Sequence, residues 1–198
     1  KIDLELILST HKKKCLSCVR SGNCELQKLC KDFRVYDEDV YAGENPQHDF
    51  DDTAKHMFRD NDKCVLCRRC VAACQKWQAV GVIGPNDRGF NTHIGCAFEQ
   101  DLGDVACVSC GQCIVVCPTG AIGEKDNTKD VWRALEDPTK HVVVQPAPSI
   151  RVPLGEAFDL PIGTNVKGKM VSALRRLGFN AVFDTDLAAD MTIVEEAN

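Results

Sequence analysis

Two runs of cysteine residues in the middle of the chain have the spacing of metal ligands. They contain eight of the thirteen cysteines: Cys64, Cys67, Cys70 and Cys74 in the first, and Cys107, Cys110, Cys113 and Cys117 in the second. Each run reads C-x2-C-x2-C-x3-C, and Pro118 follows the second. Thiolate sulfur is a soft ligand that suits zinc, copper(I) and iron–sulfur clusters. The runs therefore predict metal chemistry.

The arrangement within each run favours iron–sulfur clusters over zinc. Structural zinc sites usually take four ligands from two separated C-x2-C pairs, whereas three thiolates follow one another here, twice. A run of this kind with a terminal proline is typical of bacterial two-cluster ferredoxins, in which the fourth cysteine binds the other cluster. We therefore predict two 4Fe–4S clusters with the following ligands: Cys64, Cys67, Cys70 and Cys117 for one, and Cys107, Cys110, Cys113 and Cys74 for the other.

A third candidate metal motif lies near the start of the chain. It reads H-x3-C-x2-C-x5-C and consists of His11, Cys15, Cys18 and Cys24. Three cysteines leave one iron without a thiolate, and His11 lies about one helical turn earlier, so we predict a third 4Fe–4S cluster with His11 as its fourth ligand. Neutral imidazole should raise the reduction potential of that cluster and make it sensitive to acid. Cys30 is the alternative fourth ligand, but we interpret it as a small buried apolar side chain.

Composition and charge exclude several other classes of protein. The formal net charge of −5 argues against a nucleic-acid partner, and no apolar run is long enough to span a membrane. No secretory signal pattern precedes the cysteines, so a disulfide framework is disfavoured and reduced, metal-bound cysteines predict a cytoplasmic protein. Because the chain starts at Lys1, we expect it to be a piece of a longer polypeptide.

The elements that must position these ligands form an α+β protein in successive modules. Residues 1–34 are predicted as a small helical His/Cys cluster module, in which Leu4, Ile7, Leu8 and His11 share one helical face. Residues 35–60 are polar and are predicted as a connector with little regular structure, which does not require the flanking modules to touch.

Residues 61–123 are predicted as a two-cluster, ferredoxin-like α+β domain. Its two halves repeat each other, and each half should end in a short strand, at residues 80–83 and 119–122. The insert between the halves contains Gly84-Pro85 and further glycines, which suggests a hairpin. Cys96 lies in this insert, outside both ligand runs, and we interpret it as structural.

Residues 124–198 contain no cysteine and change in character. We predict a strand at 141–145, a helix over 166–177 that Gly178 ends, a strand at 181–183 and a helix from residue 187. Strand, helix, strand is the start of an α/β unit with a parallel sheet. We therefore expect an α/β domain that is incomplete within this chain.

The order of these parts resembles the iron-only (FeFe) hydrogenases, and in particular the large subunit of the multimeric NAD(P)-linked type. The cluster motifs also resemble the large iron–sulfur subunit of NADH dehydrogenases and the N-terminal region of some formate dehydrogenases. Segments that separate these families are similar to the opening of the hydrogenase catalytic domain: residues 142–151, 168–171, 174–179, 182–184 and 188–190.

This resemblance implies a hydrogenase that forms or oxidises dihydrogen at a 4Fe–4S cube joined to a diiron site, the H-cluster. The cysteines of that site lie downstream in the family, so we name no catalytic residue and expect the chain alone to be inactive. The implied partners are flavin- and NAD(P)-binding subunits, further iron–sulfur subunits and ferredoxin. The alternatives are a non-catalytic ferredoxin-like electron-transfer subunit and the iron–sulfur subunit of an NADH or formate dehydrogenase.

Overall fold

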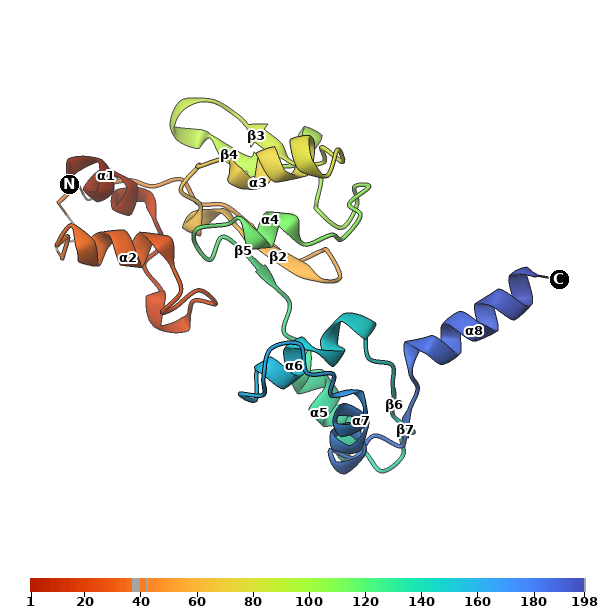
Figure 1. Ribbon diagram of the computed structural model, residues 1–198. Coiled ribbons are helices and arrows are strands. Elements are labelled where there is room, and N and C mark those ends of the chain that lie inside the picture. The colour runs from red at the N-terminus through yellow and green to blue at the C-terminus, as the bar shows by residue number, and fades with distance from the viewer. Residues whose placement is uncertain (37–39, 42, 198) are drawn as a thin grey trace. The chain divides into compact units, whose positions relative to one another are not determined.

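The computed structural model describes residues 1–36, 40–41 and 43–197 (Figure 1). The chain divides into two compact units, Lys1–Lys125 and Asp126–Asn198. Each unit mixes helices with small sheets, as the α+β prediction required. No helix among the described residues is both long and apolar enough to cross a bilayer.

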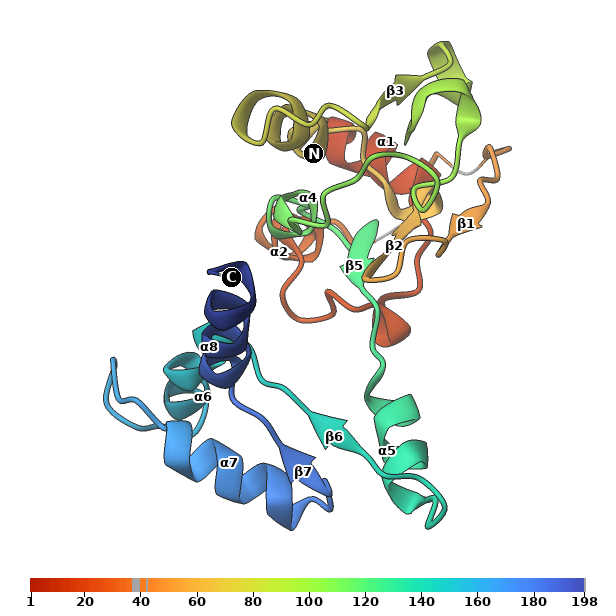
Figure 2. The ribbon, with the colours of Figure 1, turned by 90° about the vertical axis from the view of Figure 1, so that its right-hand side faces the viewer.

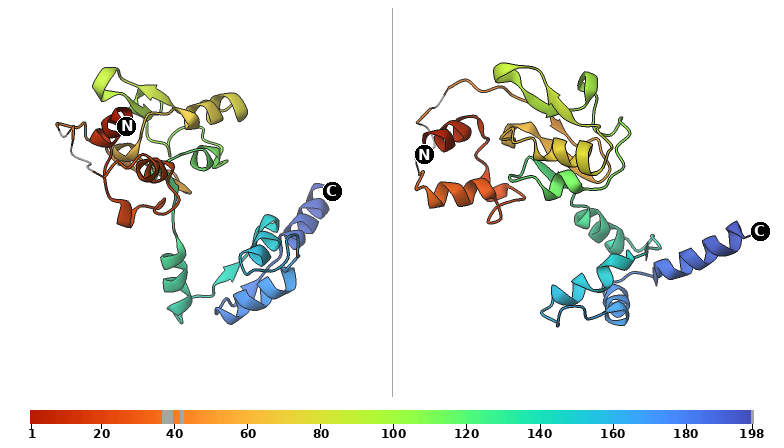
Figure 3. Two further views of the ribbon diagram at one scale, coloured as in Figure 1. Left: turned by 60° about the vertical axis from the view of Figure 1, so that its left-hand side comes forward. Right: turned by 45° about the horizontal axis from the view of Figure 1, so that its top comes forward.

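The first unit begins with two helices that share a small apolar core. Helix α1 spans Ile2–Thr10 and helix α2 spans Glu25–Asp32, with a 3-10 turn at Cys15–Ser17 between them (Figure 3). The core consists of Leu4, Leu8, Leu26 and Val35. It holds the loop with the first three cysteines between two packed helices.

The predicted helical face through His11 is wrong in two respects. The side chain of Ile7 is 39% exposed, and α1 ends at Thr10. His11 is the C-cap residue, with φ −89° and ψ 129°. Because this extended backbone leaves the helix, His11 belongs to the turn that leads to Cys15 and not to the helical stripe.

The ferredoxin-like part is built on a three-stranded antiparallel sheet in the order β1-β2-β5. Strand β1 spans Phe50–Asp51, β2 spans Met57–Asp60 and β5 spans Ile122–Glu124. Helix α3 spans Arg69–Ala72 and continues as a π-helical turn, Ala73–Trp77, while α4 spans Gln112–Val115. Helices α3 and α4 lie side by side (Figures 1 and 3), so the two halves of the repeat meet.

Two predictions about these strands need correction. The supposedly unstructured connector at 35–60 contains β1 and the central strand β2. The prediction failed because charged side chains usually indicate exposed segments, whereas several of them are buried here in polar contacts: Asp51, Arg59 and Asp60. The strand predicted at 80–83 lies instead at β3, Gly84–Asn86, and the strand predicted at 119–122 begins only at Ile122.

The predicted hairpin in the insert is confirmed. Strand β3 pairs antiparallel with β4, His93–Gly95. The Asn86 side chain donates hydrogen bonds to the Cys96 carbonyl and to Glu99, both at 2.8 Å. These bonds fix the hairpin to the segment that follows it.

The second unit contains the predicted strand–helix–strand pattern. Strand β6, Val143–Val144, pairs in parallel with β7, Ala181–Val182, and α7, Lys167–Arg176, connects them (Figure 2). Gly178 has φ +107° just after α7, as expected of a C-cap glycine. The remaining helices of this unit are α5 (Thr128–Glu136), α6 (Pro153–Glu156) and α8 (Thr185–Glu196).

Candidate metal centres

One cavity in the first unit is lined by four cysteines drawn from both runs. They are Cys64, Cys67, Cys70 and Cys117. Three come from the loop before α3 and from the helix itself, and the fourth, Cys117, follows α4 by two residues. The structure thus brings together the complete set that the sequence assigned to one cluster.

A second cavity contains the complementary set. Its lining includes Cys74, Cys107, Cys110 and Cys113. The exchange of the fourth cysteine follows from the side-by-side packing of α3 and α4, because Cys74 in the π-helical turn after α3 and Cys117 just after α4 each reach the loop of the other run. Both four-cysteine sets are therefore assembled by the fold.

The backbones of the two ligand loops repeat an unusual conformation. Leu66 and Arg68 have φ +52° and +59°, and the equivalent Ser109 and Gly111 have φ +57° and +72°. Left-handed backbone is unfavourable for residues other than glycine. Such strain at the same two places in both loops is typical of functional loops, and it curls each loop around its cavity.

Burial disfavours the thiolate form of several of these cysteines in the absence of metal. Burial raises the pKa of Cys64 to about 11, that of Cys70 to about 12 and that of Cys113 to about 11. The neighbouring cysteines of the same set add to the effect, Cys117 and Cys67 on Cys64 for example. Thiolates so close together need a positive counterpart, which metal ions supply when they replace the protons.

The third predicted site also forms a cavity. Its lining includes His11, Cys15, Cys18 and Cys24, and also Cys30. Cys30 packs against the small core of α1 and α2. His11 and Cys30 therefore both border the cavity, and His11 stays the predicted fourth ligand.

The first module packs against the ferredoxin-like part at close range. The Pro118 carbonyl accepts a hydrogen bond from the Glu25 amide at 3.0 Å and one from Cys24 Sγ at 3.7 Å. Arg69, the first residue of α3, binds Glu25 through both of its terminal nitrogens, at 2.5 and 3.0 Å. The sequence left this contact open, and it places Cys24 beside the segment that contains Cys117.

Gly120 is required by the same contact. A Cβ atom at this position would collide with Cys18 Sγ. The contact between the first module and the ferredoxin-like part thus depends on a residue without a side chain. Cys18 lies against the backbone that follows Cys117.

The donor sets match the number of ligands that a 4Fe–4S cluster takes. No group of three or more His, Cys, Asp or Glu side chains in the described ranges converges closely enough to hold a single metal ion. The cysteines of the two ligand runs are not joined by disulfides. A 4Fe–4S cluster takes one ligand at each of its four irons. The first two cavities each offer four cysteines, and the third offers His11 and three cysteines, with Cys30 as the alternative fourth ligand.

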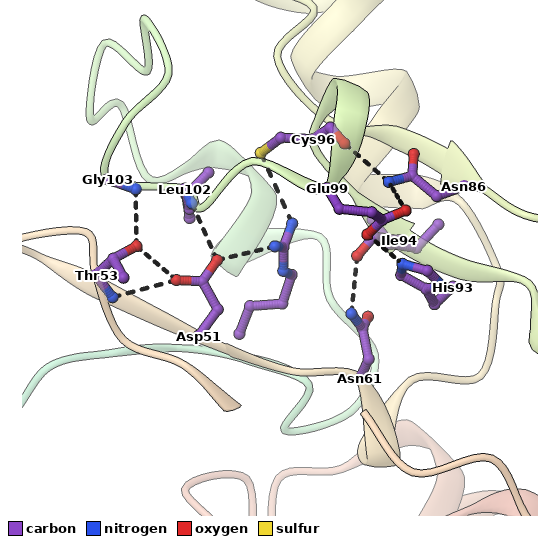
Figure 4. A network of polar contacts seen from close by, with 11 residues as sticks. Asp51, Thr53, Asn61, Asn86, His93, Ile94, Cys96, Glu99, Leu102 and Gly103 are labelled. Atoms are coloured by element: carbon purple, nitrogen blue, oxygen red, sulfur yellow. Dashed lines mark hydrogen bonds and ion pairs between the residues drawn. The ribbon is translucent and has the colours of Figure 1, made fainter. Parts of the chain in front are cut away.

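Arg59 is a buried residue of this region that the sequence analysis missed. Its guanidinium binds Asp51 at 2.8 Å and approaches Cys96 Sγ at 3.9 Å. Figure 4 shows Asp51 and Cys96 in this network. No periodic signal marks Arg59, because β2 is short and its neighbour Asp60 is also charged.

Asp51 is held in its ionised form. Burial alone would raise its pKa, but hydrogen bonds from Thr53 and from the Leu102 amide, together with Arg59, lower the pKa below its usual value. Thr53 is itself tied to the Gly103 amide at 2.9 Å (Figure 4). The carboxylate and the guanidinium therefore form a fixed ion pair inside the unit.

Three family models match separate parts of the chain. Residues 1–39 match the NADH-ubiquinone oxidoreductase-G iron–sulfur binding region, residues 63–121 match a 4Fe–4S dicluster domain, and residues 140–198 match the C-terminal domain of the iron-only hydrogenase large subunit. The three matches follow the order of the candidate first cluster module, the paired ligand runs and the second unit.

Two relatives match over nearly the whole chain. The NADP-reducing hydrogenase subunit HndD of Solidesulfovibrio fructosivorans is 49% identical over 98% of this chain and 33% of its own length. Iron hydrogenase 1 of Clostridium pasteurianum is 39% identical over 100% of this chain and 34% of its own length. The chain thus spans about a third of the length of each of these relatives.

A solved structure has a similar fold over part of the chain. It is an NAD+-reducing nickel–iron hydrogenase in the H2-reduced state, with a TM-score of 0.57 and 25% identity. The similarity covers 62% of this chain and 52% of that one.

Proposed function

We propose that the chain is the iron–sulfur part of an iron-only hydrogenase and that it relays electrons to and from a hydrogen-forming site through three 4Fe–4S clusters. The observation that supports this most strongly is the pair of four-cysteine cavities, each lined by three cysteines from one run and one from the other. Bound there, the clusters would supply one-electron transfer.

We propose the ligands of each cluster by residue. One cluster takes Cys64, Cys67, Cys70 and Cys117, the second takes Cys107, Cys110, Cys113 and Cys74, and the third takes His11, Cys15, Cys18 and Cys24. The protein's own contribution is to fix these donors, to exclude water from the buried ones and to hold the modules at close range. The contact of Cys24 and Glu25 with Pro118 supports transfer between the first module and the Cys117 site.

We further propose that the whole protein is an NAD(P)-linked hydrogenase with a diiron H-cluster held outside this chain. The name of the 49% identical relative, an NADP-reducing hydrogenase subunit, supports flavin- and NAD(P)-binding partner subunits, with further iron–sulfur subunits or ferredoxin as other electron partners. In this proposal residues 124–198 begin the catalytic domain. Cysteines that serve as metal ligands rather than in disulfides favour the reducing cytoplasm as its compartment.

The relay can be tested by comparing two electron donors in the intact, anaerobically purified enzyme. In Cys117→Ser, hydrogen evolution driven by NAD(P)H and the partner subunits should fall at least tenfold. Evolution driven by a small viologen radical, which can reach the hydrogen-forming site directly, should fall much less. The control is Cys96→Ser, because Cys96 is buried outside both cavities. Equal losses with both donors in Cys117→Ser, or no loss with either, would contradict the relay.

A further inference from the structure

Arg59 borders both four-cysteine cavities. Its side chain lines the cavity of Cys64, Cys67, Cys70 and Cys117 and also the cavity of Cys74, Cys107, Cys110 and Cys113. Only 8% of the residue is exposed. A permanent positive charge therefore lies between the two candidate cluster sites, away from water.

The partner of that charge lies outside both cavities. Asp51, also 8% exposed, binds Arg59 Nη2 at 2.8 Å, but it lines neither cavity. Thr53 and the Leu102 amide hold the carboxylate in place at 2.6–3.1 Å (Figure 4). The ion pair therefore has a fixed direction, with its positive end toward the two cavities.

One N–H donor of the guanidinium is buried without an acceptor among the described residues. Nη1 approaches Cys96 Sγ and Nη2 binds Asp51, while Nε is buried and has no acceptor among the described residues. A buried N–H without an acceptor is unfavourable. Sulfur atoms of a cluster in either cavity are acceptors of the right kind for it.

A buried ion pair is a poor means of stabilising a fold, since the desolvation of both charges offsets much of their attraction. Its position suggests another role. Reduction adds one negative charge to a cluster, and a nearby cation in a region of low dielectric constant stabilises the reduced form. Hydrogen bonds to the sulfurs act in the same direction.

We propose that Arg59 is a positioning residue that raises the reduction potentials of both clusters at once, and that Asp51 limits this effect by holding and partly neutralising the guanidinium. The inference rests on the proposed function, because it requires clusters in both cavities. In this proposal a single side chain adjusts the reduction potentials of two neighbouring clusters of the relay.

The test is an EPR-monitored redox titration of the intact, anaerobically purified protein with four variants. In Arg59→Gln the potentials of both clusters should fall. In Asp51→Asn, which leaves Arg59 without its counter-charge, both should rise. The double variant should lie between the two. The control Arg88→Gln removes an exposed arginine of the same unit and should leave both potentials unchanged.

The opposite signs separate an electrostatic role from a structural one. Shifts of Arg59→Gln and Asp51→Asn in the same direction, or unchanged potentials in both, would overturn the proposal. Where Arg59→Gln fails to assemble its clusters, Asp51→Asn must still raise the potentials, and Arg59→Lys must keep them above those of the double variant. Iron analysis separates the failure of the proposed function from the failure of the role of Arg59. A wild-type protein without these clusters refutes the proposed function, whereas bound clusters with the wrong shifts refute only the role of Arg59.

Discussion

At the scale of single residues, Gly120 shows how tightly the first module is fitted to the ferredoxin-like part. A methyl group at this position would collide with Cys18 Sγ. We predict that Gly120→Ala destabilises the contact by about 1–3 kcal/mol, the usual effect of overpacking, and lowers the iron content by the share of one cluster. Gly84→Ala is the matched control, because a Cβ atom at Gly84 meets nothing within 4 Å. Full iron content in Gly120→Ala would show that Cys18 is no ligand or that the contact yields easily.

The identity of the fourth ligand of the first cluster is a second question at this scale. We predict that His11→Cys keeps the cluster but lowers its reduction potential, because a thiolate adds a negative charge where imidazole is neutral. Electron entry from the donor should slow accordingly. A redox titration of the variant measures the shift.

Cys30 is the matched control for this prediction, since it borders the same cavity. Cys30→Ser should leave the iron content and the potential of the first cluster unchanged. Loss of the cluster in Cys30→Ser, with retention in His11→Ala, would reverse the assignment and make Cys30 the ligand.

At the scale of elements, the short helices and strands of the ferredoxin-like part have little core of their own. Its apolar core includes two of the candidate ligands, Cys70 and Cys117. Metal binding therefore contributes folding free energy there, as in other small metal-bound domains. We predict that anaerobic iron chelation unfolds residues 61–123, while residues 126–198, which form a separate unit, keep their protection from hydrogen exchange. Retained protection of α3 and α4 without iron would contradict this.

The second unit is held by a cluster of ion pairs between its elements. Arg151 and Lys167 both bind Asp184 and Asp186, which joins the start of α7 to the start of α8. Hydrogen bonds from Lys167 and Arg151 lower the pKa of Asp184 to about 2, against about 3.9 for an unperturbed aspartate. The folded-state pKa is the lower one, so the stabilisation is complete above about pH 4 and is lost as the pH falls toward 2.

We therefore predict that amides of α7 and α8 lose protection from hydrogen exchange between about pH 4 and pH 2, and that Asp184→Asn loses part of this protection already at neutral pH. Asp190→Asn, which changes an exposed aspartate on α8, is the control and should follow the wild type. Identical pH profiles of Asp184→Asn and the wild type would show that these ion pairs do not stabilise the unit.

The sequence predicted some elements well and others poorly, for physical reasons that differ. The strand–helix–strand pattern of the second unit was visible because Val143, Met170 and Gly178 carry strong local signals. Strands β1 and β2 were missed because buried charges such as Asp51 and Arg59 look like solvent-exposed residues until their partners are known. Arg59 and Asp51 are brought together because they lie opposite each other in the pairing of β1 and β2. No local sequence pattern predicts this pairing.

The cysteine sets were predictable for a different reason. Covalent spacing within each run and the repetition of the run determined which thiols could share a cavity, and the two cavities contain these sets. The packing of the first module against Pro118 was not predictable, because it depends on the close approach of Cys24 and of Cys18, next to Gly120, through tertiary structure alone.

At the scale of the whole molecule, the three candidate cluster sites form a connected series. The first module lies against the segment that contains Cys117, the Cys117 site shares Arg59 with the second site, and the second site exchanges ligands with the first through α3 and α4. Each neighbouring pair of sites is thus joined by a short structural contact. Electrons would move stepwise between an external donor and a hydrogen-forming site outside this chain.

We propose that this chain assembles three 4Fe–4S clusters on three defined ligand sets. The most direct measurement is iron and acid-labile sulfide analysis with EPR of the reduced, anaerobically purified protein, repeated for Cys24→Ser, Cys117→Ser and Cys107→Ser. We expect about twelve irons bound by this region, four for each cluster, and the loss or alteration of a different EPR signal in each variant. Bound zinc in place of iron, fewer than three cluster signals from this region, or one signal altered by all three variants would contradict it.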